Sequence, residues 1–199
     1  MELITEGNSE ETYTVTRVRK DKIWPEEVKK DYRLSNEDDL IEAQKIAHAY
    51  AKDYYQKDVS FDIFQELGER ICYDFQFDNK GAGRNTIGGQ LDNSSVKNRD
   101  CKLPVLLLAL AVNDLNPQIQ TNIVYSEENF AHPYVGMQIG EQIKFGHFVN
   151  ARPEDLNQRT RFKFTKDEKT KDLEGNTSIS VKADIDGLRR MDELFLKAL

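Results

Sequence analysis

Apolar residues in the first part of the chain recur at two spacings, which separate a strand from two helices. Residues 12–20 alternate as an edge strand does. From Ser35 onward the spacing is helical and the first turn is acidic, so Ser35 is the predicted helix cap. A second helix is predicted from about Ser60, with an apolar face made of Ile63, Phe64, Leu67 and Ile71.

The next segments are a loop and the most apolar run of the chain. Residues 78–95 are rich in glycine and asparagine, which predicts a long exposed loop. The run after this loop predicts a buried helix that opens at Cys101 and ends near Asn116 and Pro117. Its apolar part, residues 103–112, is about half the roughly 20 residues that span a bilayer, so we expect no membrane partner.

Extended segments dominate the chain after the buried helix. Residues 118–125, 132–139 and 142–150 have strand patterns, and Gly140-Glu141 is a hairpin-length turn between the last two. Two more strand-like segments and an amphipathic segment from Asp184 close the chain. We therefore expect one domain over residues 1–199, of class α+β, with helices packed on an antiparallel sheet.

Charge and cysteine content narrow the function classes. The chain has 35 acidic and 28 basic residues and a net charge of −7, which disfavours phosphate backbones and predicts no nucleic-acid partner. Two cysteines, Cys72 and Cys101, cannot form a disulfide framework, so a cytoplasmic or other reducing compartment is expected. The first residues lack a basic segment followed by an apolar one, and no secretory signal is expected.

Two ligand motifs in the glycine-rich segment are incomplete. Residues 83–90 have the spacing of a phosphate loop, but Gly-Gln stands where Lys-Ser or Lys-Thr is needed. A calcium loop from Asp78 would require a glutamate at its twelfth position, which is Gly89. The sequence therefore predicts no cofactor, and a flexible loop is the simpler interpretation.

Cys101 is a candidate nucleophile because of its position. At a helix N-terminus, unpaired backbone N–H groups and the positive end of the helix dipole stabilise a thiolate. Pro104 supports this placement, since proline is tolerated in a first helical turn. The same N–H groups could hold a developing oxyanion. Cys72, in contrast, is expected to pack in the core.

A thiolate nucleophile needs a base and a group that orients the base. Of the three histidines, His48 is expected within a helix and without catalytic duty, whereas His132 opens one predicted strand. The hairpin returns Asn150, at the end of the next strand, to the level of His132. We therefore predict a triad of Cys101, His132 and Asn150, with His147 as the alternative third member.

The segment order resembles the transglutaminase-like superfamily of papain-type folds. Residues 99–125 are similar to the family's nucleophile helix, residues 132–139 to its His-Ala-Trp strand, and residues 147–153 to the strand end with its catalytic Asp. Arg99, Pro133-Tyr134 and Asn150 replace the family's usual Gly, Ala-Trp and Asp. The resemblance covers residues 67–153 as a catalytic core and leaves residues 154–199 as a C-terminal elaboration.

The resemblance implies a cysteine hydrolase or acyltransferase that acts on a protein or peptide substrate. It also implies an oxyanion donor upstream of the nucleophile, for which Gln90 or Asn98 is the candidate. The competing interpretation is that cysteine, histidines and asparagine serve packing alone, in an inactive fold that binds a protein partner. A zinc site of Cys101, His132 and His147 is disfavoured, because no close ligand pair such as CxxC is present, and no metal is expected.

Overall fold

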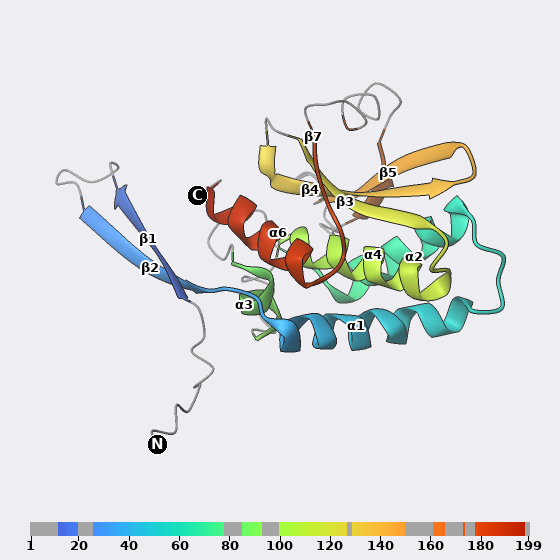
Figure 1. The fold of residues 1–199 in the computed structure, drawn as a ribbon, viewed down its shortest axis with the longest axis horizontal. Coiled ribbons are helices and arrows are strands. Elements are labelled where there is room, and N and C mark those ends of the chain that lie inside the picture. Colours follow the sequence, from blue (N-terminus) through green and yellow to red (C-terminus); the bar gives the residue numbers. More distant parts are fainter. Residues whose placement is uncertain are drawn as a thin grey trace, which may run out of the picture.

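The computed structural model describes residues 12–19, 26–77, 85–92, 100–126, 129–149, 161–165, 173 and 178–197. A two-stranded hairpin comes first, a group of helices is next, and an antiparallel sheet with a closing helix completes the chain (Figure 1). The elements are β1 (Thr12–Arg19), β2 (Glu26–Arg33), α1 (Glu37–Ala51), the 3-10 helix η1 (Lys52–Tyr54), α2 (Phe61–Asp74), α3 (Ile87–Leu91), α4 (Lys102–Leu115), β3 (Gln120–Ser126), β4 (Asn129–Ile139), β5 (Gln142–Val149), β6 (Arg161–Phe164), β7 (Ser178–Val181) and α6 (Ile185–Lys197).

A five-stranded antiparallel sheet with strand order β6-β5-β4-β3-β7 forms one layer of the molecule. Helix α4 packs against β3 and β4, and α1 packs on the side of α4 away from the sheet (Figure 1). The predicted α+β class, with helices on an antiparallel sheet, is confirmed. The segment after residue 153 supplies both edge strands, because β6 pairs with β5 and β7 pairs with β3.

Helix α4 is the centre of the hydrophobic core. Every residue from Lys102 to Val112 is buried, which confirms the predicted buried helix. Each fully buried leucine or valine stabilises the fold by about 1.5–3 kcal/mol. The predicted hairpin is also present, and its turn residue Gly140 has φ of 58°, a conformation that favours glycine.

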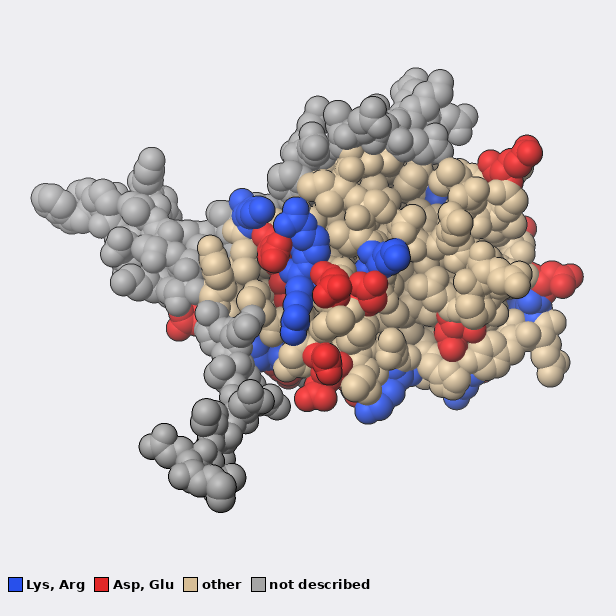
Figure 2. Space-filling model, in the orientation of Figure 1, with Lys and Arg blue, Asp and Glu red and all other residues tan. Residues whose placement is uncertain are grey.

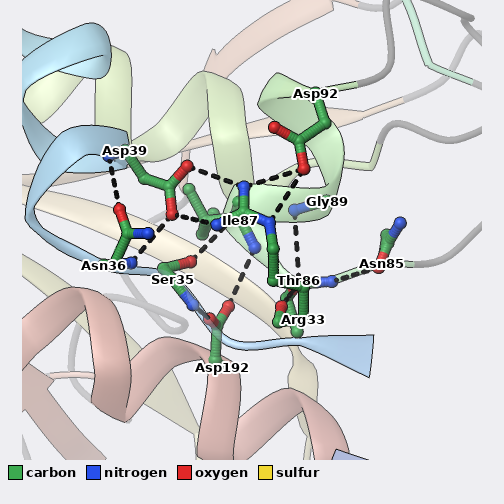
Figure 3. Close-up of polar contacts among 11 residues, drawn as sticks. Arg33, Ser35, Asn36, Asp39, Asn85, Thr86, Ile87, Gly89, Asp92 and Asp192 are labelled. Atoms are coloured by element: carbon green, nitrogen blue, oxygen red, sulfur yellow. Dashed lines mark hydrogen bonds and ion pairs between the residues drawn. The ribbon is translucent and has the colours of Figure 1, made fainter. Parts of the chain in front are cut away.

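The predicted cap of the first helix is wrong by one residue. Asn36 is the N-cap of α1, and its side chain and that of Asp39 each accept a hydrogen bond from the other's backbone N–H. Ser35 is buried and instead forms hydrogen bonds with residues that are distant in the sequence. Its N–H donates to Asp192 of α6, and its Oγ accepts from the Gly88 N–H (Figure 3). At Ser60 the predicted cap is confirmed.

The glycine-rich segment is only partly as predicted. Residues 85–92 form a turn and the short helix α3, whose first four residues are buried rather than exposed. Thr86 caps α3, and the Ile87 N–H donates to the Asp192 carboxylate at 2.8 Å (Figure 3). Gly88 permits the close approach, since a Cβ there would lie 2.7 Å from Asp39 Oδ2. The rest of the predicted loop lies outside the described residues.

Strand β2 was not predicted, because its sequence EEVKKDYR lacks apolar alternation and pairing with β1 is what defines it. In the face shown in Figure 2, acidic and basic side chains that the structure describes are interspersed over the body of the protein. Within the described ranges, no helix combines the length and apolar character that crossing a bilayer requires.

Candidate active site

Cys101 stands at the N-terminus of α4, as predicted. It is the N-cap residue of this helix, and its carbonyl accepts a hydrogen bond from the Val105 N–H at 3.1 Å. The sulfur therefore lies at the positive end of a 14-residue helix. The residue retains 6 % of its accessible surface, so the thiol is buried at the edge of the core.

An irregularity in strand pairing sets the position of His132. Val124 pairs with Tyr134, but Ser126 pairs with Asn129, so β4 advances five residues (134 to 129) where β3 advances two (124 to 126). Such bulges re-aim side chains, and they accept proline, which has no N–H for the ladder. Pro133 lies in this interval. The result is that Nδ1 of His132 lies 3.5 Å from the Cys101 sulfur.

His147 of β5 contacts the opposite side of the His132 ring. Its Nδ1 atom lies 2.8 Å from Nε2 of His132. If His132 is to accept the thiol proton at Nδ1, its own proton must be on Nε2 and must be donated to His147. His147 then carries its proton on Nε2 and offers Nδ1 as the acceptor.

The surroundings of His147 keep its ring neutral. Burial, the nearby His132 and the charge of Lys163 lower the pKa of His147 to about 4. Tyr134 stacks on the ring with centroids 5.0 Å apart and an interplanar angle of 21°. The same tyrosine meets His132 edge-on, at a centroid distance of 5.1 Å. Tyr134 therefore restrains both imidazoles.

Gln90 is linked through Asp100 to the segment that begins with Cys101. The Gln90 amide N–H donates to Asp100 Oδ1 at 3.0 Å, and the Asp100 backbone N–H donates back to Gln90 Oε1 at 3.1 Å. The second Gln90 N–H donates to the Asn85 carbonyl at 3.1 Å. One amide hydrogen bond thus holds the residue before Cys101 and the other binds the turn before α3. The oxyanion role of Gln90 stays a prediction.

The partly buried Asp100 and the buried Lys102 form an ion pair on either side of Cys101 in the sequence. Asp100 Oδ1 accepts from the Lys102 backbone N–H at 3.0 Å, and Oδ2 contacts the Lys102 ammonium group. The ammonium also lies 3.9 Å from the centre of the Phe195 ring. Sequence reasoning missed both roles. The available signal was an aspartate directly before a predicted helix start, where carboxylates cap backbone N–H groups.

The remaining candidates are either outside the described residues or at other places in the fold. Asn150 and Asn98 fall outside the described residues. His48 is an exposed residue of α1 that contacts Asp114 and Tyr55. Cys72 is buried in α2, where burial, followed by the charge of Glu69, raises the pKa of its thiol. The structure therefore brings together Cys101, His132 and His147.

The three groups form a line rather than a cage. Cys101 and His147 contact opposite nitrogens of His132, whereas a zinc site needs its ligands to converge on one point. Within the part of the chain that the structure describes, no group of three His, Cys, Asp or Glu side chains could hold a metal ion.

Comparison of the chain with models of protein families, with curated proteins and with solved structures finds no match.

Proposed function

We propose that this protein is a cysteine-dependent acyl-transfer enzyme in which Cys101 is the nucleophile, His132 the base and His147 the orienting group. The observation that carries the proposal is the continuous contact from sulfur to imidazole to imidazole, at 3.5 Å and 2.8 Å. A nucleophile, a base within reach and a third group that orients the base are the parts that covalent catalysis requires.

The proposed reaction begins when the thiol proton moves from Sγ of Cys101 to Nδ1 of His132. The thiolate attacks an acyl carbonyl carbon, and a C–S bond forms. His132 then returns the proton to the leaving amine as the C–N bond breaks, which leaves a thioester on Cys101. Water or a second amine, deprotonated by His132, attacks the thioester and releases the acyl group.

The local charges favour the ionised pair. The N-terminal end of α4 attracts negative charge on sulfur. The Asp100 carboxylate would oppose that charge, but it contacts the buried Lys102 ammonium and accepts hydrogen bonds from two N–H donors. A protonated His132 would donate from both nitrogens, to sulfur and to the neutral His147.

The arrangement supports a transglutaminase-like, papain-type variant of the α+β fold. The nucleophile begins a buried helix that packs on the sheet, and the base comes from an antiparallel strand later in the sequence. The resemblance in sequence points to peptide or amide substrates. His147 takes the orienting place for which Asn150 was predicted, and Asn150 lies outside the described residues.

The test is the pH dependence of iodoacetamide alkylation, measured separately at Cys101 and Cys72 by peptide mass spectrometry. A thiolate stabilised by His132 should titrate with a midpoint below the free value of roughly 8.5. His132→Asn should raise this midpoint by at least about one pH unit. His48→Asn is the matched control, since that exposed ring lies away from the site, and should leave it unchanged. A wild-type midpoint above pH 8 would rule out an activated thiolate.

The burial of Cys101 favours a second function, an inactive fold that serves as a protein-binding module. Only 6 % of the residue is exposed, whereas an acyl group must reach its sulfur. In that case Cys101 would react as slowly as Cys72 at every pH. Loss of its labelling after Cys101→Ser, with an unchanged melting temperature, verifies that the signal comes from this thiol.

A further inference from the structure

Asp192 of α6 has a fully buried carboxylate that binds two backbone N–H groups. The residue is 0 % exposed. One of its oxygens accepts the N–H of Ser35 and the other accepts the N–H of Ile87, each at 2.8 Å (Figure 3). Taking a carboxylate out of water costs free energy, so its presence at this junction needs an explanation.

Asp192 anchors the first turn of α3. This helix has five residues, which is too short for its own hydrogen bonds to keep it folded. Its first two N–H groups each bind a partner outside the helix, because Ile87 donates to Asp192 and Gly88 donates to Ser35 Oγ at 2.8 Å. The N–H of Ser35 in turn donates to Asp192. Asp192 therefore holds both groups, one directly and one through Ser35.

The same short helix carries Gln90, whose side chain holds Asp100. Gln90 is buried, and its amide N–H and its oxygen bind Asp100 at 3.0 Å and 3.1 Å. Asp100 also accepts the backbone N–H of Lys102 at 3.0 Å. Cys101 lies between these two residues in the chain. Hydrogen bonds thus run from α6 through α3 to the residues on both sides of the nucleophile.

We propose that Asp192 is a positioning residue for Cys101 and acts through α3, Gln90 and Asp100. The inference rests on the proposed function, because it requires a Cys101 thiolate that forms against His132. Proton transfer needs the sulfur and the imidazole within hydrogen-bond reach. A displacement of the residue before Cys101 changes the 3.5 Å contact between Sγ and Nδ1 of His132 and so weakens the thiolate.

A carboxylate suits this role because both of its oxygens accept hydrogen bonds and neither donates one. Asparagine at position 192 has one oxygen and one NH₂ group, so it can accept from Ser35 or from Ile87 but not from both. Asp192→Asn therefore keeps the shape of the side chain and releases one of the two anchored groups.

The test measures the pH dependence of Cys101 alkylation by iodoacetamide in wild type, Asp192→Asn and Asp186→Asn, at a temperature at which each protein is folded. Asp192→Asn should raise the alkylation midpoint by about one pH unit, which is a tenfold smaller thiolate population at a fixed lower pH. Asp186 is an exposed residue in the first turn of the same helix, so its variant should leave the midpoint unchanged.

A double variant shows whether the effect passes through Gln90. Gln90→Met removes the hydrogen bonds between α3 and Asp100. In that background Asp192→Asn should lower the melting temperature further but should not shift the midpoint again. A second shift of equal size would show that Asp192 acts by another route and would overturn the inference.

The outcomes separate this inference from the proposed function. A low wild-type midpoint that Asp192→Asn leaves unchanged, with a lower melting temperature, overturns the positioning role and keeps the catalytic pair. A wild-type midpoint above pH 8 contradicts the proposed function and the inference with it. If Asp192→Asn does not fold, Ser35→Ala replaces it, since this change removes only the acceptor of the Gly88 N–H. A raised midpoint in Ser35→Ala then supports the inference, and an unchanged one overturns it.

Discussion

His132 and His147 meet nitrogen to nitrogen, with 2.8 Å between Nε2 of the first ring and Nδ1 of the second. Only one proton can lie between these atoms, so the contact couples the tautomers of the two rings. With His147 neutral above its lowered pKa of about 4, that proton belongs to His132. His132 Nδ1 is thereby available to the Cys101 sulfur at 3.5 Å.

The first prediction concerns the position of the atom of residue 147 that accepts a hydrogen bond from His132. In His147→Asn the amide oxygen occupies the place of Nδ1 and can accept from His132, whereas in His147→Gln the oxygen lies one bond farther along the side chain. We expect His147→Asn to retain most of the Cys101 alkylation rate at pH 6 and His147→Gln to lose about tenfold, the equivalent of one hydrogen bond. Equal losses in both variants would show that the acceptor position is irrelevant. The same pair of changes at His48 is the control.

The second prediction depends on the sign of the His147 shift. Its pKa is about 4 in the folded state and near 6.5 when exposed, so the unfolded chain binds the proton first as the pH falls. The stability associated with neutral His147 is complete above pH 6.5 and is lost as the pH falls to 4. Partial exposure of the ring limits this loss to about 2 kcal/mol.

Urea unfolding at pH 7 and pH 4 measures this effect. His147→Asn cannot titrate, so its loss of stability between the two pH values should be smaller than that of wild type by about 2 kcal/mol. Groups that do not contact residue 147 titrate equally in both proteins and cancel in the comparison. An identical pH dependence for the two proteins would contradict a depressed pKa at His147.

The third prediction concerns the hydrogen bonds that hold the residue before Cys101. Gln90→Met keeps the shape of the side chain but removes its hydrogen bonds to Asp100 and Asn85. We expect a loss of about 2–3 kcal/mol in the free energy of unfolding, because buried polar partners are left unsatisfied. Slower Cys101 alkylation should accompany it. Gln44→Met on the exposed side of α1 is the control and should stay within about 0.5 kcal/mol of wild type. An equally small loss of stability for Gln90→Met would mean that Asp100 keeps its position without the Gln90 hydrogen bonds.

The fourth prediction concerns the strand that carries His147. A Cβ on Gly146 would collide with the ring of Phe162, which also packs over Gly68 of α2. Gly146→Ala should therefore destabilise the fold by about 1–3 kcal/mol through overpacking. Leucine at position 162 makes room for the new Cβ. The double variant Gly146→Ala, Phe162→Leu should therefore unfold with a free energy at least about 1 kcal/mol higher than the sum of the two single changes predicts. Strict additivity in urea unfolding would show that the two residues do not compete for space.

Local patterns predicted much of this fold. The apolar run of α4, the Gly140 hairpin and the helical spacing of α2 each depend on neighbours within a few residues. These signals identified Cys101 as a helix start and His132 as a residue of the sheet that comes after it. The same signals failed where a residue distant in the sequence binds a group that local reasoning had assigned to a cap. Asp192, 157 positions away, accepts the Ser35 N–H, and the N-cap of α1 is Asn36.

The amino-acid sequence by itself determined the class of elements, the burial of α4 and the candidacy of Cys101 and His132, because periodicity and turn chemistry act over short separations. Tertiary structure alone decided that these two residues touch and that His147 contacts the second nitrogen. That choice depends on a register shift between β3 and β4 and on the pairing of β4 with β5. Strand register is set by packing against the whole core, so no local pattern encodes which side chains finally meet.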